Sequence, residues 1–175
     1  MKTSTWVFAA MLVGIAPAAS ADPLLGDPTP RQTPFDRGRI SLMGGAGSQN
    51  AFGYRYFGVG LGVGYFVVDG LEVGLFGLHE FGDGPSLNEV SPSVRYIAQP
   101  LVGRWPVVPY AGVFYNHWFV GDPGSDSDTA GTRAGVVYLS GRLIAGIGVA
   151  YEHVLSACVD SCDQIYPDVM LGFTM

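Results

Sequence analysis

The 175-residue chain is poor in charge, in lysine and in cysteine. Charged residues make up 14% of it, and 15 acidic residues against 9 basic ones give a formal charge of −6. The only lysine is Lys2. Nucleic-acid binding needs a basic surface that neutralises phosphates, so this composition argues against nucleic acid as a partner. The hydrophobic share of 48% is too high for a disordered chain.

Residues 1–21 have the pattern of a secretory signal peptide. Lys2 supplies the positive start, residues 6–15 form a short apolar run, and residues 19–21 form a small-residue cleavage site. The apolar run is shorter than the ~17–25 residues that a membrane-spanning helix needs. We therefore expect export with removal of residues 1–21. A Pro-rich periplasmic lead over residues 22–37 and a single domain over residues 38–175 would follow.

The two cysteines, Cys158 and Cys162, are separated by only three residues. In an exported protein an isolated pair this close favours a small disulfide loop over a metal site. Zinc requires about four ligands, and the nearest histidine, His153, brings the number only to three. We predict a Cys158–Cys162 disulfide, no bound metal and no cofactor.

Alternation with a period of two dominates the chain after residue 37. In residues 57–67 the odd positions are large and apolar, whereas the even positions are mostly glycine. A helix cannot present such a pattern as one face, so the segment is predicted to be a strand. The same reasoning predicts eight strands and no helix, with strands over residues 38–48, 51–67, 70–81, 88–101, 106–119, 131–140, 142–154 and 164–174.

The predicted connections alternate between tight turns and longer polar loops. Residues 68–70 and 140–142 are tight, whereas residues 81–87, 120–130 and 155–163 are longer. This layout is typical of an outer-membrane barrel and predicts an all-β, eight-stranded, antiparallel up-and-down transmembrane barrel. Proline is tolerated near the start of a strand, and there we expect Pro92, Pro109 and Pro167.

The face that each strand turns outward separates a membrane barrel from a soluble one. One face carries Leu, Val, Ile, Phe and Tyr, and the other carries mainly glycine, alanine and serine. An eight-stranded barrel has an interior only just wide enough for side chains, so the bulky row is predicted to point outward. A lipocalin-like barrel would have the reverse arrangement. Aromatic residues near both strand ends, Phe66 among them, predict two interfacial girdles.

Three segments make the chain resemble the OmpA/OmpX-type family of small bacterial outer-membrane barrel proteins. They are the Gly-x-Gly run of residues 58–64, residues 71–75 after a tight turn, and residues 169–173. The resemblance spans about residues 38–175 and implies outer-membrane lipid, lipopolysaccharide and the barrel assembly machinery as partners. Family members commonly end on an aromatic residue that this machinery reads, which makes Phe173 the candidate assembly signal, although Met175 is last.

Strand parity places several charged side chains inside the predicted barrel. Unpaired charges in so narrow an interior would be costly, so we predict an Arg–carboxylate network that plugs the lumen. The alternative is a gate or a narrow polar passage. The predicted members are Glu72, Glu80, Arg95, Arg133, Glu152 and Asp168.

An enzymatic function is a further alternative, because lipid A deacylases are small barrels with an outward His, Ser and Glu. Here His153 and Ser156 are three residues apart, which places them on opposite faces of one strand. We therefore expect a non-enzymatic, monomeric protein with a structural or surface-interaction role in the envelope. The alternatives are a narrow, porin-like channel or conduit for small or hydrophobic molecules and, after it, a lipid A-modifying enzyme.

Overall fold

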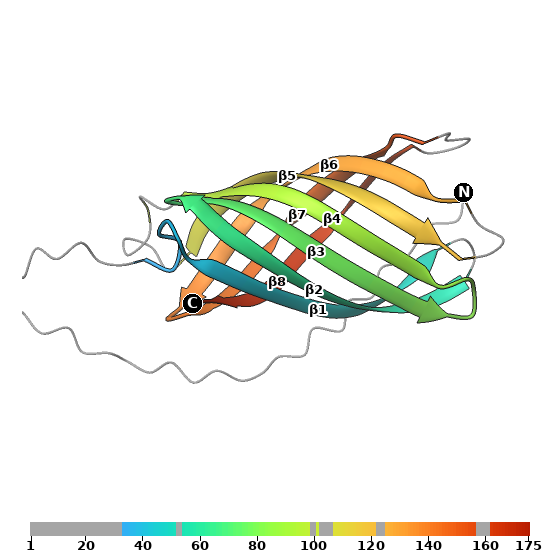
Figure 1. The fold of residues 1–175 in the computed structure, drawn as a ribbon, viewed down its shortest axis with the longest axis horizontal. Coiled ribbons are helices and arrows are strands. Elements are labelled where there is room, and N and C mark those ends of the chain that lie inside the picture. The colour runs from blue at the N-terminus through green and yellow to red at the C-terminus, as the bar shows by residue number, and fades with distance from the viewer. Residues whose placement is uncertain (1–32, 52–53, 99–100, 102–106, 122–124, 157–161) are drawn as a thin grey trace, which may run out of the picture.

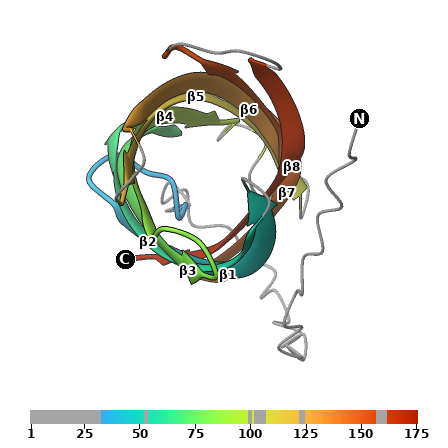
Figure 2. The same ribbon diagram turned by 90° about the vertical axis from the view of Figure 1, so that its right-hand side faces the viewer.

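The computed structural model describes residues 33–51, 54–98, 101, 107–121, 125–156 and 162–175. The predicted signal peptide and most of the predicted lead lie outside the described residues. Eight antiparallel strands follow one another around a closed barrel in sequence order (Figures 1 and 2). The strands are β1 (Ile40–Ala51), β2 (Tyr54–Val68), β3 (Leu71–Gly82), β4 (Leu87–Ile97), β5 (Val107–Val120), β6 (Ser127–Ser140), β7 (Leu143–Val154) and β8 (Asp163–Thr174).

The predicted fold class and strand number are confirmed, and the strand ends differ by up to four residues. β6 begins at Ser127, whereas the sequence pattern predicted its start at residue 131. The early start follows from Asp128, which is anchored to β5 because His117 Nδ1 lies 2.7 Å from its Oδ1. Polar residues at the loop-side end therefore continue the strand, where the pattern indicated a loop.

Two tight turns, from β2 to β3 and from β6 to β7, lie at one end of the barrel, which we call the turn side. Gly70 and Gly141 have φ angles of 78° and 62°, a left-handed conformation that glycine adopts without a Cβ penalty. The opposite end, where β1 joins β2, β3 joins β4, β5 joins β6 and β7 joins β8, is the loop side. The connection from β4 to β5, residues 98–106, also lies on the turn side and is longer than any loop-side connection. In the described parts of the chain, no helix is long and apolar enough to cross a membrane.

The expectation for proline is wrong for Pro92, which is the sixth residue of β4 and not near its start. Pro92 pairs with Leu75 of β3. On its other side the ladder to β5 is interrupted, since pairing stops at Val90 and resumes at Ser93. Proline has no N–H to donate, so this position is tolerated where one ladder is broken.

The seam between β1 and β8 is much shorter than the other ladders. Only four residue pairs join these strands, from Ser41↔Thr174 to Gly44↔Leu171. The other neighbouring strands share nine to twelve pairs. The barrel is thus closed at the turn side of the seam, whereas residues 45–51 and 163–170 do not pair with each other. Pro167 lies in this unpaired stretch of β8.

The predicted sidedness of the strands is confirmed. Leu61, Ile147 and Ile165 are 74%, 63% and 71% exposed on the outer surface. The charged Glu72, in contrast, is only 2% exposed. Exposed aromatic rings mark both ends of the barrel: Tyr54, Phe57, Phe81, Tyr115, Phe119 and Tyr151 on the loop side, and Tyr65, Tyr96, Tyr138 and Phe173 on the turn side.

Candidate functional site: the polar lumen

The turn-side end of the lumen is filled by an apolar cluster that we call the turn-side plug. The sequence interpretation placed Phe66 in the outer girdle, and this is wrong, because Phe66 is fully buried inside the barrel. Inward positions at the strand ends carry branched or aromatic side chains that meet across the narrow interior. The plug consists of Phe35, Phe66, Ile97, Val108, Val137 and Ile144.

Phe35 reaches this plug from the segment that precedes β1. Its ring is fully buried, and its centroid lies 5.6 Å from that of Phe66. Its carbonyl accepts a hydrogen bond from the amide of Gly70 at 2.9 Å, and the amide of Gly38 donates to the carbonyl of Phe66 at 2.8 Å. From the sequence we expected Phe35 in an external periplasmic lead, and this is wrong, because its ring is buried in the barrel. Its only signal was a single aromatic residue in a polar, Pro-rich segment.

Next to the plug, toward the loop side, Arg95 and Glu72 form a buried ion pair. They face each other across the β3–β4 ladder, and Arg95 Nε donates to Glu72 Oε2 at 2.8 Å. The Ser41 hydroxyl donates to the other carboxylate oxygen, Oε1. The two charged side chains are 7% and 2% exposed. A Cβ at Gly64 would overlap Glu72 Oε1, so glycine there leaves room for the carboxylate.

Arg133 and Asp168 form a looser pair nearer the middle of the barrel. Arg133 Nη1 lies 3.9 Å from Asp168 Oδ1, and its guanidinium stacks 4.4 Å from the centroid of the Phe114 ring. Tyr110 donates its hydroxyl to Asp168 Oδ2 at 2.7 Å. A neutral donor and a cation therefore share this carboxylate, and an aromatic face holds the arginine.

Glu152 is held by amides and a hydroxyl, and no ion pair involving it was found among the described residues. Asn116 Nδ2 donates to its Oε1 and Gln164 Nε2 donates to its Oε2, both at 2.9 Å. The Thr129 hydroxyl also donates to Oε1. These three donors were not among the predicted lumen residues, although strand parity places all of them inward. A buried carboxylate can be satisfied in this way without a cation.

The loop-side half of the lumen is rich in carboxylates. Glu80 is only 3% exposed, and its Oε1 would lie 3.3 Å from a Cβ at Gly58. Glu89 occupies an inward position of β4, between the buried Leu87 and Ser91, and was also missed. The described inward residues thus include five carboxylates and two arginines: Glu72, Glu80, Glu89, Glu152 and Asp168 against Arg95 and Arg133.

The residues considered above for catalysis have other partners in the part of the chain that the structure describes. Within the described ranges, no group of three His, Cys, Asp or Glu side chains is placed to hold a metal ion. His153 and Ser156 make their hydrogen bonds elsewhere, since His153 Nδ1 lies 2.8 Å from Asp163 Oδ1 and the amide of Asp128 donates to Ser156 Oγ at 2.7 Å. The predicted disulfide stays a prediction, because Cys158 lies outside the described residues.

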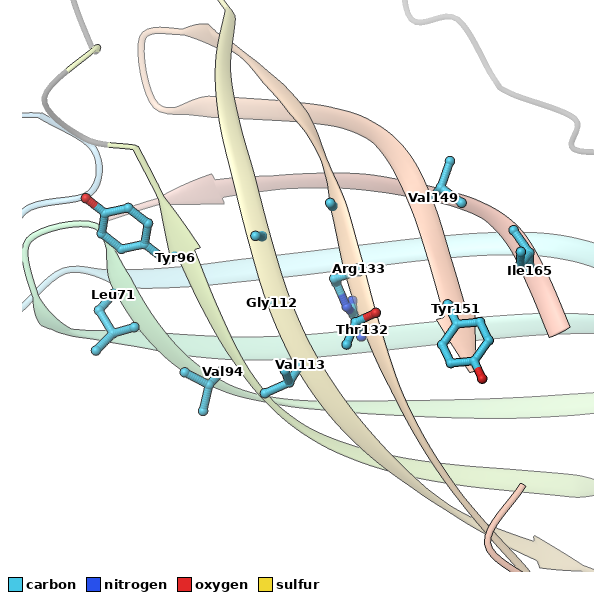
Figure 3. Close-up of a pocket in the computed structure, with 12 residues that line it drawn as sticks. Leu71, Val94, Tyr96, Gly112, Val113, Thr132, Arg133, Val149, Tyr151 and Ile165 are labelled. Carbon is cyan, nitrogen blue, oxygen red and sulfur yellow. The ribbon is translucent and has the colours of Figure 1, made fainter. Parts of the chain in front are cut away.

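A groove of about 670 Å³ crosses the outer surface from β3 to β8 (Figure 3). Its floor is formed where small side chains, Ala111, Thr132 and Ala134, replace the bulky outward residues. Most of its lining is apolar, although Arg133 also borders it. The wall residues are Leu71, Val94, Tyr96, Val113, Val149, Tyr151 and Ile165.

No protein-family model matches the chain. No curated protein is significantly similar to it. Among solved structures, it is similar to the outer membrane protein OprG from Pseudomonas aeruginosa, with 16% identity, a TM-score of 0.49, and coverage of 80% of this chain and 97% of that one. It is also similar to Neisserial surface protein A, with 18% identity, a TM-score of 0.48, and coverage of 78% and 92%. Such distant likeness concerns the fold and assigns no function to this chain.

Proposed function

We propose that the chain is a bacterial outer-membrane β-barrel with a structural, non-enzymatic role in the envelope. The observation that carries the proposal is the inverted distribution of side chains. Leu61 and Ile165 are more than 70% exposed on the outside, whereas Glu72, Arg95 and Glu152 are at most 6% exposed inside. In water such an outer surface would promote aggregation, whereas in a bilayer it is the required contact with acyl chains. The predicted signal peptide would supply the export that this location needs.

The filled interior supports a structural role over a channel. The turn-side plug closes one end, and the Arg95–Glu72 pair occupies the layer above it. An eight-stranded barrel has little room left once side chains of this size point inward. The acidic residues at the loop-side ends would be presented at the cell surface, to lipopolysaccharide or to other partners.

The proposal is tested with the full-length gene expressed in a Gram-negative host. The protein should be recovered in the outer-membrane fraction, and unboiled samples should migrate differently from boiled ones on a detergent gel, because closed barrels resist detergent until heated. In planar bilayers the native protein should give no steady ion conductance. Recovery as a detergent-free soluble protein would refute the membrane location, and steady conductance would refute the sealed lumen.

A second candidate function is a conduit for small hydrophobic molecules, and the short β1–β8 seam favours it. A molecule entering from the loop side could leave sideways where residues 45–51 and 163–170 do not pair. Continuing the seam register would bring Ala46 opposite Val169. In a background with both native cysteines replaced by serine, a bismaleimide cross-link between A46C and V169C should abolish uptake of a hydrophobic dye if the seam is the exit. Unchanged uptake would refute the seam as the exit and would leave the structural role as the remaining proposal.

A further inference from the structure

All three histidines of the chain occupy equivalent positions in successive hairpins. Each lies near the loop-side end of an odd-numbered strand, with its side chain on the outer surface. Each also faces an Asn or Asp in register on the strand that follows. We call these three pairs the histidine belt: His79 with Asn88, His117 with Asp128, and His153 with Asp163.

The contacts within the belt orient every imidazole in the same way. The Nδ1 atoms of His79 and His117 each lie 2.7 Å from the side-chain Oδ1 opposite, and that of His153 lies 2.8 Å from its partner. A carboxylate only accepts, so Nδ1 of His117 and of His153 donates. The proton that decides the charge of these two rings therefore resides on Nε2. The side chains of His117 and His153 are 33% and 49% exposed.

The belt lies at the level of the loop-side aromatic girdle. The His117 ring meets the Phe119 ring edge-on at 4.4 Å, and His79 lies 5.9 Å from Phe81. The Tyr115 hydroxyl donates to the same Asp128 carboxylate that His117 contacts, and Tyr151 donates to Asp163 at 2.5 Å. Girdle aromatics of a barrel sit at the membrane–water interface, so the belt faces the polar headgroups of that leaflet.

Few charged groups face the histidines from the neighbouring strands. His79 lies between Val59 of β2 and Asn88 of β4. His117 lies between Val90 of β4 and Asp128 of β6. His153 lies between Ala130 of β6 and Asp163 of β8. Apart from the Tyr115 and Tyr151 hydroxyls, the two aspartates are thus the titratable groups that these registers place against the belt.

The surroundings of the belt make its charge dependent on histidine. Among the described residues, the charged side chains on the outside of the loop-side end are one arginine, Arg55, and four aspartates, Asp83, Asp126, Asp128 and Asp163. Their formal net charge is 1 − 4 = −3. Three protonated imidazoles would bring this sum to zero. Histidine is the side chain whose charge ordinarily changes between pH 5 and 8.

We propose that the histidine belt is a headgroup-binding surface that contacts the phosphates of anionic lipids in mildly acidic conditions. The proposal rests on the membrane location proposed above. A protonated Nε2 donates a charge-assisted hydrogen bond to a phosphate oxygen, whereas Nδ1 remains held by its Asx partner. At higher pH, Nε2 has no proton to donate and the aspartates leave the surface negative, so phosphate is repelled. The regular placement on alternate strands would spread three such contacts along the β3–β8 face of the barrel.

The test uses the protein reconstituted in phosphatidylcholine vesicles that contain spin-labelled phosphatidylglycerol or spin-labelled phosphatidylcholine. The phosphodiester of phosphatidylglycerol does not titrate between pH 5 and 8, so a pH effect comes from the protein. The preference for phosphatidylglycerol should rise about two- to five-fold from pH 8 to pH 5 in the native protein. It should stay flat in the triple variant H79Q/H117Q/H153Q.

Arg142 provides a matched control, since it is exposed in the β6–β7 turn on the turn side, the end of the barrel opposite the belt. R142Q should lower the preference equally at both pH values and leave the pH ratio unchanged. A native protein without a pH effect, or a triple variant that keeps it, would overturn the inference. A boiled–unboiled gel of the same vesicles separates the two proposals: failure to insert refutes the membrane location and the belt together, whereas insertion without a pH effect refutes the belt alone.

Discussion

Replacing Arg95 with methionine should leave the Glu72 carboxylate buried with the Ser41 hydroxyl as its donor. The pair is 7% and 2% exposed, so solvent screens the loss very little. Removing one partner of a buried ion pair costs about 3–5 kcal/mol, because the remaining charge is uncompensated. Each 1.4 kcal/mol is about tenfold in the unfolding equilibrium, so R95M should raise the unfolded fraction at least a hundredfold.

The double variant E72Q/R95M separates pairing from packing. If the two side chains act as one unit, the double variant should recover about 2–3 kcal/mol of the summed single losses, the upper range of measured coupling energies. Unfolding is followed by tryptophan fluorescence in urea with the protein in lipid vesicles. R133M is the comparison, since the 3.9 Å separation of Arg133 from Asp168 predicts a smaller loss than R95M. Single losses that add within about 0.5 kcal/mol would refute the network.

Three further predictions concern the same interior. Phe35→Ala should cost about 3–5 kcal/mol in urea unfolding, as for other buried rings, and an unchanged midpoint would show that Phe35 does not plug the barrel. Gly64→Ala should lower the folded fraction on a boiled–unboiled gel, because the methyl group overlaps the Glu72 carboxylate, whereas Gly45→Ala in the middle of β1, with open space around it, should not. Glu152→Ala should destabilise by about 1–3 kcal/mol for each buried donor left unsatisfied, and Glu152→Gln by less; equal losses would contradict the hydrogen-bonded arrangement.

Strand number, fold class and sidedness could be predicted because they depend on local chemistry. Few structures other than a β-strand are compatible with a period of two and a row of glycines opposite bulky residues. When the bulky face points outward into lipid, the sheet must close into a barrel so that every backbone group is hydrogen-bonded. Parity also identified the inward charges, including the partners Glu72 and Arg95. Glu89 follows the same parity, so its inward position could also be predicted from the sequence.

Which inward residues meet was decided by the tertiary structure alone. The register between β3 and β4 places Glu72 opposite Arg95. Glu152 accepts hydrogen bonds from amide groups of β5 and β8. No local sequence pattern encodes such pairing between distant residues. The same holds for the insertion of Phe35, which depends on its contacts with Phe66 and Gly70. It holds also for the short β1–β8 seam, which depends on how the first and last strands meet when the barrel closes. The sequence by itself determined that this chain forms eight strands with an apolar outside. Only the closed barrel decided how its interior is filled, because that depends on contacts between strands far apart in the chain.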